Sequence, residues 1–111
     1  MLRFEPGSVI VDRYKVKGCQ SQVWLKPAWQ GDALAFEGYS DAGIVRGLVA
    51  LILRVYSGHT PDEIMRTPAD FVDELGLSEH LSQNRASGLA AMIKQIKLYA
   101  LALQTTRANA S

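Results

Sequence analysis

The chain is poor in cysteine and has almost no excess charge, and each shortage excludes a class of function. Its 111 residues include one cysteine, Cys19, so it cannot close an internal disulfide or build a metal site from several thiolates. Twelve basic residues are matched by eleven acidic ones and form no cluster, which gives no electrostatic case for nucleic acid as a partner. Any chemistry of this sulfur is therefore expected to need a second molecule.

Long hydrophobic runs are missing as well. The longest, residues 47–53, lies between Arg46 and Arg54 and is far shorter than the roughly 20 residues that a membrane-spanning helix needs. The first residues show no basic region followed by a small-residue cleavage site, so no signal peptide is predicted. A single cysteine without an export signal favours a reducing, cytoplasmic compartment and no membrane partner.

Three segments rich in β-branched and aromatic residues predict strands, at residues 9–16, 23–29 and 33–39. Residues 29–32 predict a tight turn between the second and third segments, and strands joined so closely must be antiparallel. Cys19 falls in the connection between the first and second segments. A loop at the end of a sheet can present a thiol outward or fold it away.

The rest of the sequence predicts helices. The spacing of apolar residues predicts a mostly buried central helix over residues 41–56, with Ser40 as N-cap and Asp41 as an acidic residue in the first turn. Residues 60–63 form a capping-box motif with proline at the first helical position, which predicts the start of a short helix.

A second short helix is expected from about residue 69 to residue 76, and a long last helix from about residue 82 to residue 104. The last helix carries an apolar stripe at helical spacing, and the polar tail from residue 105 onward is expected to fray. The fold prediction is an α+β domain in which a three-stranded antiparallel meander packs against a helical layer. Residues 1–111 are expected to form a single domain.

The surroundings of Cys19 allow two interpretations. Free cysteine is among the most buried residue types, so Cys19 could be a small core residue. Its neighbours favour a reactive sulfur instead, because Gly18 frees the backbone, Lys17 supplies a nearby positive charge and the residues that follow are polar. A direct effect of Lys17 on the thiol and a merely solvated lysine both remain open.

Four ordered blocks of sequence decide between these interpretations. Residues 16–25 read VKGCQSQVWL, residues 40–48 read SDAGIVRGL, residues 56–64 read YSGHTPDEI and residues 80–89 read HLSQNRASGL. Together they resemble the SufE-type sulfur acceptors of iron–sulfur cluster assembly, over about residues 16–100. The related cluster scaffolds of the IscU type use several cysteines, which disfavours a scaffold function for this chain.

The resemblance implies a function and the residues that perform it. A pyridoxal-phosphate-dependent cysteine desulfurase would donate sulfur, Cys19 would hold it as a persulfide, and a downstream iron–sulfur scaffold would receive it. The chain itself would need no cofactor and would act as an activator of the desulfurase rather than as a stand-alone enzyme. Two further family motif residues are Asp41 and Arg85, and the partner-binding residues of the cysteine block would be Lys17, Gln20, Ser21 and Gln22.

Other interpretations stay open beside this one. Asp41 could serve only the helix start, where an acid contributes about 0.5 kcal/mol, whereas Arg85 suits an interface that reads a carboxylate or an anionic sulfur. The chain could also be a docking module that binds a desulfurase or scaffold without carrying sulfur. A metal site is not predicted, because His59 and His80 are not at ligand spacing from each other or from Cys19. A thiol hydrolase lacks an assignable base.

The start of the chain departs from the family pattern. Helical residues normally precede the cysteine motif in that family, whereas here residues 1–18 include the turn signal of residues 5–8. Leu98 and Leu101 add apolar surface outside the core stripe of the last helix. We therefore predict that a second copy of the chain covers this surface as a homodimer, or that the first residues fold back over it.

Overall fold

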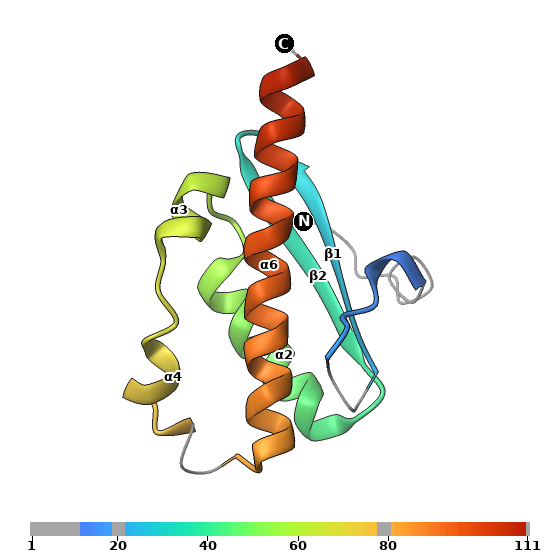
Figure 1. Ribbon diagram of the computed structural model, residues 1–111, viewed down its shortest axis with the longest axis vertical. Helices are drawn as coiled ribbons and strands as arrows, with labels where there is room; N and C mark the ends of the chain where they lie inside the picture. The colour runs from blue at the N-terminus through green and yellow to red at the C-terminus, as the bar shows by residue number, and fades with distance from the viewer. Residues whose placement is uncertain (1–11, 19–21, 78–80, 111) are drawn as a thin grey trace.

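The computed structural model describes residues 12–18, 22–77 and 81–110, and within them a hairpin is covered on one face by helices (Figure 1). Strands β1 (Val23–Gln30) and β2 (Ala33–Ser40) form the hairpin. The longest helix, α6, lies in front of the hairpin and of α2, with α3 and α4 along one side (Figure 1). The remaining bounds are η1 (Asp12–Tyr14), α2 (Gly43–Tyr56), α3 (Pro61–Arg66), α4 (Phe71–Glu74) and α6 (Gln83–Ala110).

The hairpin confirms the predicted antiparallel pair. Its register runs from Val23 opposite Ser40 to Gln30 opposite Ala33, so the loop is the two residues Gly31 and Asp32. Gly31 has a φ of +66°, a conformation that glycine adopts without the steric cost of a side chain, and positive φ at the first loop position is typical of tight hairpins. The buried residues of the hairpin are Val23, Trp24 and Leu25 in β1 and Leu34, Phe36 and Ser40 in β2.

Proline in the middle of β1 is explained by the pairing. Pro27 lies opposite Phe36 and has no N–H group, so these two residues cannot exchange ladder hydrogen bonds. The N–H of Phe36 then points to the other edge of β2, where it donates to the Ser57 hydroxyl at 2.9 Å. That edge is also paired through Leu34 and His59.

The three-stranded meander is not confirmed, because the described sheet has two strands. Of the predicted first strand, residues 9–11 lie outside the described residues and Asp12–Tyr14 form a 3-10 helix. Lys15 makes one isolated bridge to Trp24, and the Val16 N–H donates to the Val23 carbonyl at 2.8 Å. The α+β class is correct, and the expected strand contributes a single bridge to the edge of β1.

Helix α2 packs directly on the hairpin, and it begins later than predicted. A β-carbon at Gly38 would lie 2.5 Å from Cγ1 of Val49, so only glycine allows this approach of helix and strand. The N-cap is Ala42 without a side-chain hydrogen bond, and the first turn contains no acid. The predicted roles of Ser40 as N-cap and Asp41 as first-turn residue are therefore wrong. The expectation of a mostly buried helix is wrong as well, since only five of its 14 residues are buried and Ile44 is 59% exposed.

The two short helices follow the local signals. In α3 the Thr60 hydroxyl accepts the Glu63 N–H and the Glu63 carboxylate accepts the Thr60 N–H, which confirms the capping box. Those hydrogen bonds are the main reason that the pKa of Glu63 lies below its ordinary value. Helix α4 occupies the centre of the second predicted segment, and Gly76 follows it with a φ of +70°.

Lys97 of α6 closes the other end of α3. Its Nζ donates to the carbonyl oxygens of Ile64 and Met65, each at 3.3 Å, and of Thr67 at 2.6 Å. The last carbonyls of a helix favour a cation, so one lysine serves three acceptors. Two of them have a second donor, since the Ile64 carbonyl also accepts the Thr67 N–H at 3.3 Å and the Thr67 carbonyl accepts the Tyr56 hydroxyl at 3.4 Å. The same ammonium lies 5.6 Å from the centre of the buried Tyr56 ring.

The predicted fraying of the tail is wrong, because α6 continues to Ala110. Arg107 explains the extra turns. Its Nη1 donates to the Gly31 carbonyl at 2.9 Å, and its guanidinium lies 4.2 Å from the centre of the Trp29 ring. The hairpin turn thus holds the end of the helix, an interaction between residues 76 positions apart. The predicted core stripe of α6 is confirmed at Leu89, Ile93, Ile96 and Ala100, which are buried, whereas its last member, Leu103, is only partly buried against the core.

Candidate functional site

The cysteine loop joins two exposed ends of described chain. Cys19, Gln20 and Ser21 lie outside the described residues, and the loop connects Gly18 to Gln22, which are both exposed. Gly18 has a φ of +92°, which a residue with a side chain rarely adopts. Lys17 is exposed one residue earlier. The residues on both sides of the loop therefore lie at the surface of the protein.

Asp41 fastens the far end of this loop. Its Oδ1 accepts the backbone N–H of Gln22 at 3.2 Å, and its own N–H donates to the Gln22 carbonyl at 3.4 Å. Because Asp41 directly follows β2, this pair of hydrogen bonds ties the exit of the cysteine loop to the segment that leads into α2. The structure thus places one of the predicted site residues, Asp41, next to another, Gln22.

Helix α6 borders the near end of the loop. A β-carbon at Gly18 would lie 3.4 Å from the β-carbon of Ala91, so backbone and helix are already in close approach. A pocket of about 320 Å³ opens beside this contact. It is lined by Lys17 and Gly18 from the loop side and by Ala91, Lys94, Gln95 and Leu98 from α6.

Lys94 was not predicted as a site residue, although it joins Lys17 in lining this pocket. Ala91, Lys94, Gln95 and Leu98 recur at spacings of three, one and three residues, which places them on one side of a helix. No signal within a few residues marks Lys94, because its place beside Lys17 follows from the approach of Gly18 to Ala91.

Arg85 lies apart from this pocket. It is exposed in the first turn of α6, and its N–H donates to the Ser82 hydroxyl at 3.3 Å. Ala91 follows six residues later, which is about 9 Å farther along the helix axis. Among the residues with described positions, Arg85 forms no ion pair, so the structural role of joining two helices receives no support.

The histidines do not converge on the loop. His59 bridges the edge of β2 at Leu34, and its Nδ1 lies 3.9 Å from the Glu63 carboxylate. His80 lies outside the described residues. Within the described ranges, no group of three or more histidine, cysteine, aspartate or glutamate side chains is placed to hold a metal ion. In the same ranges, no helix is both long enough and apolar enough to cross a membrane.

Comparison with known proteins identifies one family that the chain resembles over most of its length. The profile of the SufE family, described as an Fe-S metabolism associated domain, matches residues 6–100. A SufE-like protein of Rhizobium meliloti is 54% identical over 88 residues, covering 75% of this chain and 63% of that protein. A SufE-like protein of Rhizobium etli is 48% identical over 88 residues, covering 75% and 60%.

A SufE-like protein of the cyanobacterium Synechocystis is 38% identical over 100 residues, covering 90% of this chain and 62% of that protein. The chain thus spans about three-fifths of the length of the curated relatives that it matches. The family profile covers most of the chain and includes the cysteine block, Asp41 and Arg85. This chain therefore belongs to the SufE family of iron–sulfur metabolism.

Proposed function

We propose that this chain accepts sulfur from a cysteine desulfurase on Cys19 and relays it to iron–sulfur cluster assembly. The observation that carries the proposal is the position of the only cysteine, inside the VKGCQSQVWL block of a chain that the SufE profile matches over residues 6–100. The exposure of Gly18 and Gln22 supports it, because a thiol that exchanges sulfur with two partners must be reachable.

The proposed step is a thiol–persulfide exchange. The Cys19 thiolate attacks the terminal sulfur of a persulfide on the desulfurase, and a new sulfur–sulfur bond forms at Cys19 Sγ. The sulfur–sulfur bond of the donor breaks, and its electron pair stays on the donor cysteine as a thiolate. No net oxidation occurs. A second exchange of the same kind passes the terminal sulfur to an acceptor thiol of the assembly machinery.

Several residues of the chain have different roles in this step. Lys17 and Lys94 line the pocket beside Gly18 and stabilise the thiolate and the persulfide anion through their charge. Asp41 holds Gln22 and so limits the conformations of the loop. Arg85, Gln20, Ser21 and Gln22 contact the partner, and a reducing cytoplasmic compartment keeps the thiol free.

Mass spectrometry of the intact protein tests the proposal. The reduced chain is incubated with a cysteine desulfurase and cysteine, without reductant, and its mass should increase by one or more sulfur atoms. Cys19→Ser should show no gain, since this variant has no thiol. An unmodified wild-type chain, in a reaction where the desulfurase turns over, contradicts the carrier function and favours the docking module that binds without carrying sulfur.

A further inference from the structure

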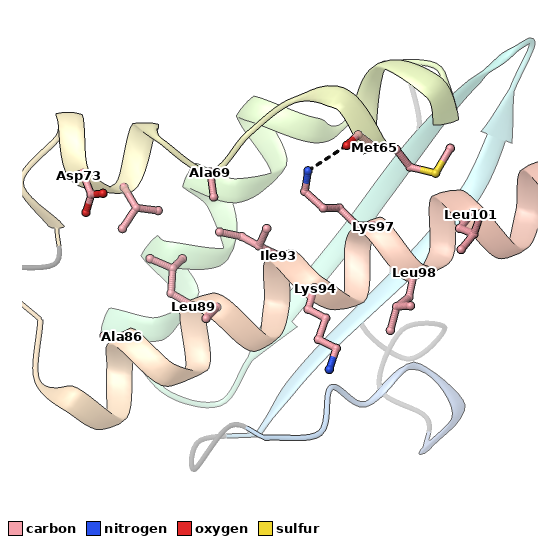
Figure 2. A pocket seen from close by; sticks show the side chains of 12 residues that line it. Met65, Ala69, Asp73, Ala86, Leu89, Ile93, Lys94, Lys97, Leu98 and Leu101 are labelled. Atoms are coloured by element: carbon pink, nitrogen blue, oxygen red, sulfur yellow. Dashed lines mark hydrogen bonds between the residues drawn. The ribbon is translucent and has the colours of Figure 1, made fainter.

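A long apolar groove runs along α6 on the side of α3 and α4. Its volume is about 670 Å³, and its lining is apolar except for Asp73, Lys94 and Lys97. Figure 2 shows Met65 and Ala69 along one wall, Leu89 and Ile93 on α6, and Leu101 near one end. The groove is separate from the contact between Gly18 and Ala91, but Lys94 and Leu98 line both this groove and the pocket beside Gly18.

The α6 wall of the groove is a second apolar stripe beside the core stripe. It consists of Ala86, Ala90, Lys94, Leu98 and Leu101, spaced by three or four residues along one helix face. Leu98 is 47% exposed and Leu101 is 51% exposed, so neither belongs to the buried core. The stripe is about 22 Å long, since each helical residue adds about 1.5 Å.

The chemistry of the lining selects the backbone conformation of an occupant. Among the lining residues, Lys97 directs its Nζ to the carbonyls of α3, so it does not serve an incoming chain. An extended segment in such a groove would leave backbone N–H and C=O groups without partners, whereas a helix satisfies them internally. The alanines at positions 69, 86 and 90 are small enough to let a helix approach closely.

The charge at the middle of the stripe selects the partner. Lys94 stands midway between Ala86 and Leu101, so two copies pairing their stripes antiparallel over the full length would bring their Lys94 side chains together. A carboxylate at that place is favourable instead, and the nearby Lys17 adds to the attraction. We propose that the groove binds one amphipathic helix of a partner protein, with its apolar face in the groove and an aspartate or glutamate facing Lys94.

The proposed helix goes beyond the sulfur-transfer function and does not depend on it. Because Lys94 and Leu98 belong to both the groove and the pocket beside Gly18, a docked helix would lie next to the anchor of the cysteine loop. The bound helix and the cysteine loop would then lie on opposite sides of Lys94 and Leu98.

Selection from a library of displayed helical peptides tests the proposal on the full, reduced chain. The selected peptides should carry apolar residues at helical spacing, with an acid on one flank. The double variant Leu98→Lys/Leu101→Lys should weaken their binding by about tenfold or more, because it replaces two exposed apolar contacts with charges that the bound helix would bury. Ile44→Lys is the matched control, because Ile44 is 59% exposed on α2, outside the groove, and its replacement should leave binding unchanged.

A charge swap tests the recognition of the carboxylate. Lys94→Glu should weaken binding of the selected acidic peptide by about fivefold, and a peptide with lysine in place of the acid should regain it. Selected peptides that bind the double variant as tightly as the wild type would overturn the proposal, as would a selection that enriches no helical sequence. Light scattering that shows a dimer in the wild type and a monomer in Leu101→Lys would overturn it in favour of a second copy.

Discussion

The two sides of α6 differ in chemistry, although they share two residues. The side toward Gly18 is small and partly polar, with Lys17, Lys94 and Gln95 around the anchor of the cysteine loop. The side toward α3 and α4 has a groove about twice as large, lined mostly by apolar residues. The comparison shows that one helix can present polar groups beside the cysteine loop and apolar groups in a groove, because the two sets of side chains lie on different sides of it.

The largest expected effect is a loss of stability, and it comes from the side of α6 that faces α3 and α4. Lys97→Met removes the ammonium that bridges α6 to three carbonyls of α3, and we expect a loss of about 2 kcal/mol of unfolding free energy, because hydrogen bonds from charged donors are the stronger kind. Urea denaturation measures it. Lys94→Met is the matched control on the same helix, and it should change the unfolding free energy by less than about 0.5 kcal/mol.

If the two lysine variants lose equal stability, Lys97 does not hold the wall of the groove. The comparison between the two sides of α6 also predicts a difference in function. Lys97→Met should still accept sulfur on Cys19 at a temperature where it is folded, since its contacts lie on the side of α3.

A smaller effect is expected at the cysteine loop. Asp41→Ala removes the acceptor of the Gln22 N–H, and we expect the rate of sulfur acceptance to fall several-fold while stability falls by about 1 kcal/mol. Asp41→Asn keeps an oxygen acceptor and should restore most of the rate. Single-turnover transfer from a loaded desulfurase measures it. A rate for Asp41→Ala equal to that of the wild type would show that the hydrogen bond to Gln22 does not order the loop for transfer.

The smallest effect on stability is expected at Arg85. Its side chain is exposed and forms no ion pair with the other residues that the structure describes, so Arg85→Ala should change the melting temperature very little. Stimulation of the desulfurase should nevertheless decrease, because arginine is suited to reading a carboxylate or an anionic sulfur at an interface. Equal losses of melting temperature and stimulation would make Arg85 a structural residue.

The elements that the sequence predicted well depend on neighbouring residues. The capping box of α3 needs only Thr60, Pro61 and Glu63, and the hairpin turn needs only glycine at position 31. The core stripe of α6 follows from helical periodicity. Such signals are contained within a few residues, so a single sequence displays them.

The elements that were missed depend on partners far along the chain. Asp41 looks like a first-turn acid, but its carboxylate accepts the N–H of Gln22, so the helix starts later. The polar tail remains helical because Arg107 reaches Gly31 and Trp29. Lys94 becomes a candidate site residue only because Gly18 approaches Ala91 in the folded chain. The prediction for the loop residues Cys19, Gln20 and Ser21 stays a prediction, since they lie outside the described residues.

The most direct test of the account follows the sulfur itself from the donor to Cys19. A desulfurase is loaded with isotopically labelled sulfur, freed of cysteine and mixed with the reduced chain for a single turnover. The account predicts that the label leaves the desulfurase and is recovered, after trapping and digestion, on the peptide that contains Cys19. Label that remains on the desulfurase while the two proteins form a complex would contradict sulfur transfer and leave this member of the SufE family a docking module.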